Sequence, residues 1–181
     1  MAKKQTKRVK IPTKPSKKKF NWKQPQTWQL APFATLGPIG YFPKGSGTIG
    51  SLVALPLAYL ASSLGIYWLW AVTLCVFLLG LRAVGQFTAD SKEKDPGCVI
   101  VDEVAGQLVA FWVVLPQFMH WPILLIGFVL FRFFDICKFG PVAFWDRRKK
   151  PLGVMMDDIM AGAFSGFILA VLQVMAISNI K

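Results

Sequence analysis

Residues 48–81 read TIGSLVALPLAYLASSLGIYWLWAVTLCVFLLGL and contain no charged side chain. One helix needs about 20 apolar residues to cross a bilayer, so this run is too long for a single span. A Ser-Ser-Leu-Gly step at residues 62–65 interrupts it, which is typical of a turn. We therefore predict a helical hairpin over 48–64 and 66–82, whose first arm either crosses the membrane or re-enters it.

Three more apolar segments follow, at 98–115, 121–138 and 153–178. The chain is 54% hydrophobic, and its apolar residues form long runs instead of an amphipathic repeat. This pattern predicts an all-α integral membrane protein, a polytopic bundle of about five helices. Residues 28–181 are expected to form one membrane-embedded domain.

The distribution of basic residues predicts the topology. The net charge is +12, and eleven of the 21 Lys and Arg residues precede residue 45. Residues 1–27 lack apolar stretches, so we interpret them as a disordered Lys-rich cytoplasmic tail near membrane lipids, not a nucleic-acid-binding segment. With this tail inside, the loops 82–98 and 136–153 are also cytoplasmic, and 20 of the 21 basic residues lie inside, as the positive-inside rule requires.

The same crossing count places all nine acidic residues on the cytoplasmic side. Two adjacent pairs begin apolar segments, Asp102 with Glu103 and Asp157 with Asp158. Carboxylates at the edge of the hydrocarbon are costly unless paired, hydrated or bound to a cation. Helix capping accounts for one acid per helix, but less naturally for adjacent acids on two helices.

Glycine spacing connects the two pairs. Asp102 is followed at i+4 by Gly106, and Asp158 by Gly162 and Gly166 at i+4 and i+8. Small residues on one face let membrane helices approach closely. We expect the third and fifth apolar helices to touch through these glycines, with Asp102 and Asp158 facing each other.

Carboxylate ligands without His or Cys at usable spacing suit Mg²⁺ or Mn²⁺. The single histidine, His120, lies on the opposite side, which excludes a phosphohistidine mechanism. A metal-activated water or a carboxylate nucleophile remains. The candidate catalytic residues are Asp102, Glu103, Asp135, Asp157 and Asp158.

If the substrate carries a phosphate group, it would need cationic side chains and N–H donors at the same depth in the membrane as the carboxylates. The glycine-rich stretch 44–51, KGSGTIGS, leads into a helix whose free N–H groups suit an anion. Candidate phosphate-binding residues, including the two cations near the end of the fourth apolar segment, are Lys44, Gly47, Thr48, Ser51, Arg132 and Lys138.

Four segments in this order, GSGTIGSLVALPL (45–57), VIVDEVAGQ (99–107), FRFFDICK (131–138) and GVMMDDIMAG (153–162), resemble the phosphatidylglycerophosphatase A family. The resemblance implies a bacterial inner-membrane enzyme with a cytoplasmic active site. It implies removal of the terminal phosphate from an anionic phospholipid, phosphatidylglycerophosphate, with Mg²⁺ as cofactor.

By this resemblance the metal-binding and catalytic carboxylates are Asp102 with Glu103, Asp157 with Asp158, and Asp135 in an RxxD with Arg132. It adds Asp90 as an upstream metal ligand. The family's KPxP is replaced here by Lys138-Phe139-Gly140-Pro141, so the local turn differs.

Two rival functions stay open from sequence alone. Intramembrane carboxylates also mark transporters or channels for Mg²⁺ or protons, although such a path needs polar groups on both sides. A non-catalytic assembly protein predicts no metal dependence. The oligomeric state is not set by the sequence.

Overall fold

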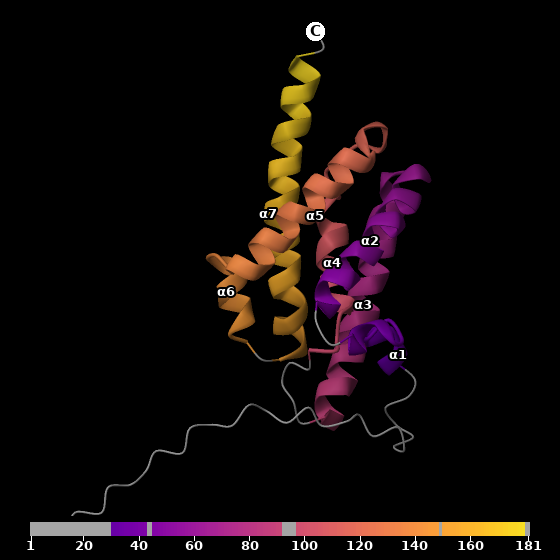
Figure 1. Ribbon diagram of the computed structural model, residues 1–181, viewed down its shortest axis with the longest axis vertical. Coiled ribbons are helices and arrows are strands. Elements are labelled where there is room, and N and C mark those ends of the chain that lie inside the picture. Colours follow the sequence, from indigo (N-terminus) through magenta and orange to yellow (C-terminus); the bar gives the residue numbers. More distant parts are fainter. Residues whose placement is uncertain (1–29, 43–44, 92–96, 149, 180–181) are drawn as a thin grey trace, which may run out of the picture.

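The computed structural model describes residues 30–42, 45–91, 97–148 and 150–179. The predicted tail, 1–27, lies outside the described residues, as does Lys44. Within them all regular structure is helical, as predicted (Figure 1). The α-helices are α1 (Ala31–Ala34), α2 (Ser46–Ser63), α3 (Ile66–Ser91), α4 (Val101–Ala110), α5 (Trp121–Cys137), α6 (Pro141–Asp146) and α7 (Pro151–Ser178), with 3-10 turns at Ile39–Tyr41 and Pro116–Phe118.

The predicted hairpin is present as α2 and α3. Gly65 lies between them with φ of +126°, a backbone conformation that residues with a Cβ rarely adopt. Three of the described helices are long and apolar enough to cross a membrane, at 46–63, 66–86 and 151–178. The chain is therefore a membrane protein with three candidate spans, and α5, with 17 residues, is at the lower length limit.

The third apolar segment is much less helical than predicted. Only the ten residues of α4 form a helix, which is about 15 Å long and too short to cross a bilayer. At its start, the Ile100 N–H donates to the carbonyl of Ala34 instead of joining a helix. After Ala110 the chain tightens, since the N–H groups of Phe111 and Trp112 donate to carbonyls three residues back. Pro116 then disfavours helical geometry at Leu115, whose backbone is extended. The expectation that the apolar segment 98–115 forms one continuous helix was wrong.

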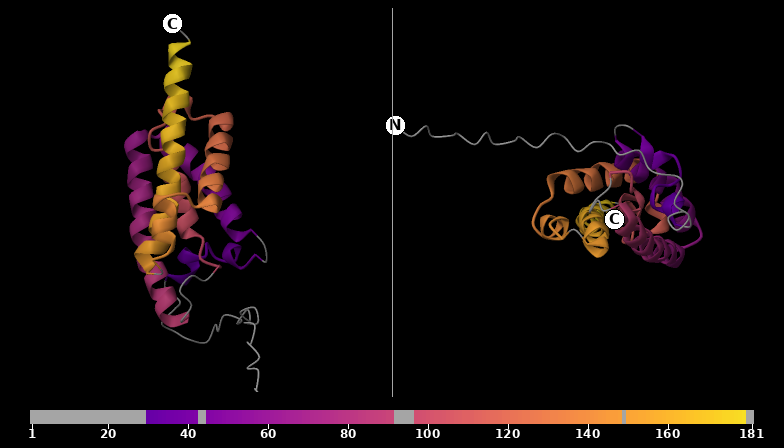
Figure 2. Two further views of the ribbon diagram at one scale, coloured as in Figure 1. Left: turned by 90° about the vertical axis from the view of Figure 1, so that its left-hand side faces the viewer. Right: turned by 90° about the horizontal axis from the view of Figure 1, so that it is seen from below.

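Helix α4 is the centre of the bundle. It contacts α2, α3, α5 and α7, and every residue in it is buried except Glu103, which is half-buried. Figure 2 shows α6 and α7 on one side of the bundle and α2 and α3 on the other. The irregular backbone just before α4, where Val99 and Ile100 are buried, is thus shielded by protein, which is where such backbone is tolerated in membranes.

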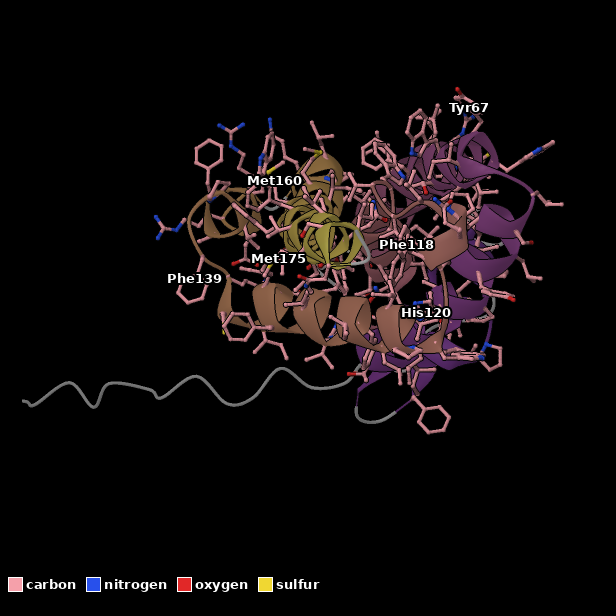
Figure 3. All side chains as sticks on the ribbon, turned by 90° about the horizontal axis from the view of Figure 1, so that it is seen from above. Tyr67, Phe118, His120, Phe139, Met160 and Met175 are labelled. Carbon is pink, nitrogen blue, oxygen red and sulfur yellow. The ribbon has the colours of Figure 1, made fainter. Side chains whose placement is uncertain are left out.

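The outside of the bundle is apolar. Large side chains such as Tyr67, Trp68, Phe139 and Phe167 are more than half exposed, and Tyr67 and Phe139 project from its periphery (Figure 3). Exposed apolar surface of this extent is unusual in a soluble monomer and is normal against lipid.

The predicted glycine contact joins α4 to α7. A Cβ built on Gly162 would overlap the carbonyl oxygen of Gly106, and one on Gly106 would overlap the backbone of Asp158. Farther along, a Cβ on Gly166 would lie 3.1 Å from the carbonyl oxygen of Ala110. Backbone therefore packs directly on backbone from Gly106 to Ala110 of α4 and from Asp158 to Gly166 of α7.

This contact predicts that Gly162→Leu destabilises the protein by about 1–3 kcal/mol, because α4 and α7 must separate to admit the side chain. Thermal unfolding in detergent measures the loss. The matched control is Ala163→Leu, which adds a similar side chain at an exposed position on the same helix. Equal melting temperatures for the two variants would contradict the packing described here.

Candidate active site

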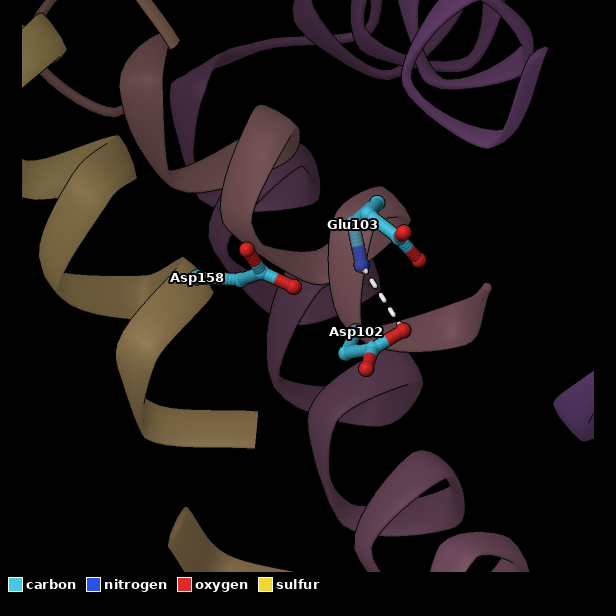
Figure 4. A group of neighbouring side chains, drawn as sticks. All are labelled: Asp102, Glu103 and Asp158. Carbon is cyan, nitrogen blue, oxygen red and sulfur yellow. Dashed lines mark hydrogen bonds between the residues drawn. The ribbon is translucent and has the colours of Figure 1, made fainter. Parts of the chain in front are cut away.

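Three carboxylates from two helices converge where α4 meets α7. One oxygen from each of Asp102, Glu103 and Asp158 lies within 4.8 Å of the others (Figure 4). Asp102 and Glu103 occupy the first turn of α4, and Asp158 lies in the third turn of α7, opposite Gly106. We call these three residues the acidic triad.

The triad is held in position by backbone. The Glu103 N–H donates to Oδ1 of Asp102 at 3.1 Å, a contact that orients this carboxylate (Figure 4). On the other side, Glu103 packs against the start of α2, where a Cβ on Gly47 would overlap its Oε1. A side chain at position 47 would therefore have to displace the Glu103 carboxylate from its present place against α2.

The triad has the properties of a cation site. Asp102 and Asp158 are both less than 10% exposed, and like charges at this separation repel unless a cation lies between them. The ion pairs of the described residues involve neither Glu103 nor Asp158. Buried carboxylate oxygens with no nitrogen or sulfur ligand among them suit a hard divalent cation.

Asp157 has a different environment from its neighbour Asp158. Its Oδ2 accepts a hydrogen bond from Nζ of Lys138 at 3.1 Å, and its Oδ1 is buried without a hydrogen-bond partner. Lys138 also pairs with Asp146, on α6. Burial alone would lower the pKa of Lys138, but hydrogen bonding to Asp146 and the nearby charge of Asp157 outweigh it and raise the pKa, so the ammonium stays charged.

A cavity of about 420 Å³ adjoins all these groups. Besides the triad, it is lined by Asp135, Asp157 and the Lys138–Asp146 pair, together with Ser46, Gly97, Val99 and Val154. Its walls therefore combine six carboxylates with one ammonium group. The volume is enough for a phosphate headgroup.

The other predicted residues lie around this cavity. Arg132 forms an ion pair with Asp135 at 2.7 Å and contacts Oγ of Ser51 at 3.5 Å. Gly47, Thr48 and Ser51 are in the first two turns of α2, next to Ser46, which lines the cavity. Of the predicted phosphate-binding residues that the structure describes, Lys138 is the one on the cavity wall.

Two predicted residues are not placed at the site. The backbone of Asp90 belongs to the last turn of α3, but its side chain is outside the described residues, as is the whole of Lys44. Their predicted roles stay predictions.

Sequence reasoning missed Asp146 and the helix that carries it. The sequence predicted a loop where α6 lies, although Pro141 begins this helix at a position where proline is favoured. Lys138 takes a left-handed conformation at the end of α5, and Gly140 has φ of +49°. These two turns direct α6 back toward α7, which brings Asp146 to Lys138.

A family model described as phosphatidylglycerophosphatase A matches residues 32–173. The phosphatidylglycerophosphatase A of Haemophilus influenzae is 32% identical over 136 residues, covering 74% of this chain and 82% of the relative. That of Escherichia coli is 34% identical over 131 residues, covering 72% and 75%. A Bacteroides thetaiotaomicron protein provisionally named a phosphatidylinositol-3-phosphatase is 32% identical over 137 residues, covering 73% and 86%. No solved structure matches this chain.

The contact between α2 and Glu103 generates a prediction. Gly47→Ala should weaken binding of Mn²⁺, measured by electron paramagnetic resonance, by roughly tenfold, because the methyl group displaces a carboxylate of the triad. The matched control is Gly85→Ala, since a Cβ there meets its nearest neighbour, Pro151, at an ordinary 3.8 Å. If the Gly47→Ala variant binds Mn²⁺ with unchanged affinity, the proposal that Glu103 is a cation ligand is wrong.

Proposed function

Because the chain belongs to the phosphatidylglycerophosphatase A family and is a phosphomonoesterase of phospholipid biosynthesis, we propose that it hydrolyses the terminal phosphate of phosphatidylglycerophosphate with Mg²⁺. The products are phosphatidylglycerol and inorganic phosphate. The observation that carries the proposal is the acidic triad beside Lys138 in one cavity. Membership of an enzyme family argues against the transporter and assembly hypotheses.

We assign cation binding to Asp102, Glu103 and Asp158, with Asp90 as a further candidate. The triad oxygens are close enough together to share one ion, and Glu103 Oε2 is a buried oxygen without a hydrogen-bond partner. When bound, Mg²⁺ supplies a positive charge that stabilises the phosphoryl oxygens as the phosphorus–oxygen bond breaks.

Lys138 and Asp157 are suited to act on the phosphate and on water. The Lys138 ammonium is the cavity-lining cation of the described residues, and we assign it to a phosphate oxygen. Asp157 Oδ1, unpartnered and buried, is suited to accept the proton of the attacking water. The water oxygen then forms the new bond to phosphorus as the bond to the glycerol oxygen breaks, and the proton taken by Asp157 passes to that leaving oxygen.

Arg132 contributes by holding Asp135. Its guanidinium joins this cavity-lining carboxylate to Ser51 on α2. The start of α2, with Gly47, Thr48 and Ser51, adds the positive end of a helix dipole next to the cavity. We propose that both features lower the energy of a dianionic phosphate in a site rich in carboxylates.

Phosphate release by the purified full chain in detergent tests the function. Phosphatidylglycerophosphate with Mg²⁺ should give turnover, excess EDTA should abolish it, and Asp158→Asn should reduce it at least ~100-fold, because a cation ligand is lost. Phosphatidylinositol 3-phosphate is the comparison substrate, suggested by the Bacteroides relative. Equal turnover of both lipids would reject the proposed specificity. Turnover in the presence of excess EDTA would reject the requirement for a divalent cation.

We also propose that the site faces the cytoplasm in a bacterial inner membrane. The triad lies toward the N-terminal ends of α4 and α7, and the loop between α6 and α7 carries Arg148 and Lys150, as cytoplasmic loops do. A topology reporter fused after residue 149 should therefore report the cytoplasm, and one at Lys181 the periplasm. The reverse result would place the site outside.

A further inference from the structure

Gln107 is a polar side chain with no evident role in the fold. It is fully buried on α4, and neither its amide nitrogen nor its amide oxygen has a hydrogen-bond partner. A buried amide without partners is unfavourable, and native proteins keep few of them. An apolar residue of the same size would avoid the penalty, so the amide needs an explanation.

The position of Gln107 on the helix supplies one. It lies four residues after Glu103, on the same face of α4, and side chains on a helix lean toward its N-terminus. Its amide therefore leans toward the turn that carries Glu103. There, Oε2 of Glu103 is also buried without a partner.

Two unsatisfied groups on adjacent turns are complementary in kind. The Gln107 amide is a donor, and the Glu103 carboxylate oxygen is an acceptor. Gln to carboxylate pairs at this spacing are compatible with helix geometry.

We propose that Gln107 is a positioning residue. Its amide N–H donates to Oε2 of Glu103 and orients this carboxylate toward Asp102 and Asp158, the other two members of the acidic triad. This inference rests on the proposed cation site and deepens it. Hydrogen bonds to ligating carboxylates fix their direction and raise metal affinity. A lysine or arginine at this position would neutralise the charge on Glu103. A neutral amide orients the carboxylate and leaves its charge available for a cation.

Gln107 is not a substrate-binding residue. It does not line the cavity, and its complete burial keeps a lipid headgroup away from it. Gly47, at the start of α2, lies against Oε1 of Glu103. The carboxylate would thus contact α2 through Oε1 and the amide through Oε2.

The test uses the full chain in detergent and Mn²⁺ as the probe. Gln107→Met keeps the length and unbranched shape of glutamine and removes the amide. We expect Mn²⁺ affinity, measured by electron paramagnetic resonance, to fall at least ~10-fold, while the melting temperature in EDTA stays equal to wild type or rises. Gln107→Leu provides a second apolar variant.

Ser62→Ala is the matched control. Ser62 is likewise buried with an unpartnered side-chain oxygen, but it lies at the far end of α2 from Gly47. Its removal should leave Mn²⁺ affinity unchanged. This comparison separates a role in the site from the general effect of removing an unsatisfied polar group.

The outcomes distinguish the two proposals. Wild-type binding that Asp158→Asn abolishes but Gln107→Met leaves unchanged would reject the positioning role and keep the cation site. A clear loss of stability of Gln107→Met in EDTA would make the residue structural and reject the role as well. Wild-type protein that binds no Mn²⁺ would reject both.

Discussion

The backbone contact between α4 and α7 determines where the charges of this protein lie. Gly106 and Gly162 let the two helices approach without side chains between them, so Asp158 is held beside the first turn of α4. Three carboxylates then share a volume in which each raises the electrostatic energy of the others. This repulsion opposes the α4–α7 contact when no cation is bound, and a bound cation would relieve it.

Acidic residues that are adjacent in sequence contact different parts of the protein. Asp158 turns toward α4 and joins the triad, whereas Asp157, one residue earlier, turns toward Lys138. Neighbouring residues on a helix point about 100° apart, so one pair of aspartates can serve two functions. A similar separation holds on α4, where Asp102 lies beside Asp158 of α7 and Glu103 packs against the start of α2.

Much of the candidate site could be predicted because its sequence spacings follow helix geometry. Glycines at i+4 from Asp102 and Asp158 were sufficient to predict the α4–α7 contact. The length of α4 could not be predicted in this way, since its start depends on a hydrogen bond to Ala34, far away in sequence. Asp146 was missed for a related reason, because its position depends on the two left-handed turns after α5.

The exposed apolar surface also contributes to the site, because it sets the depth of the cavity in the membrane. A lipid substrate keeps its acyl chains in the hydrocarbon, so its phosphate can reach only groups near the interface. The cavity lies at the ends of α4, α5 and α7 that carry charged residues, while exposed apolar residues such as Phe167 and Val174 cover the rest of α7. In the proposed reaction, burying this surface in lipid would set the depth of Lys138 and the triad relative to the phosphate. Substrate positioning would then be shared between the cavity and the bilayer, so that a modest cavity would suffice for a large lipid.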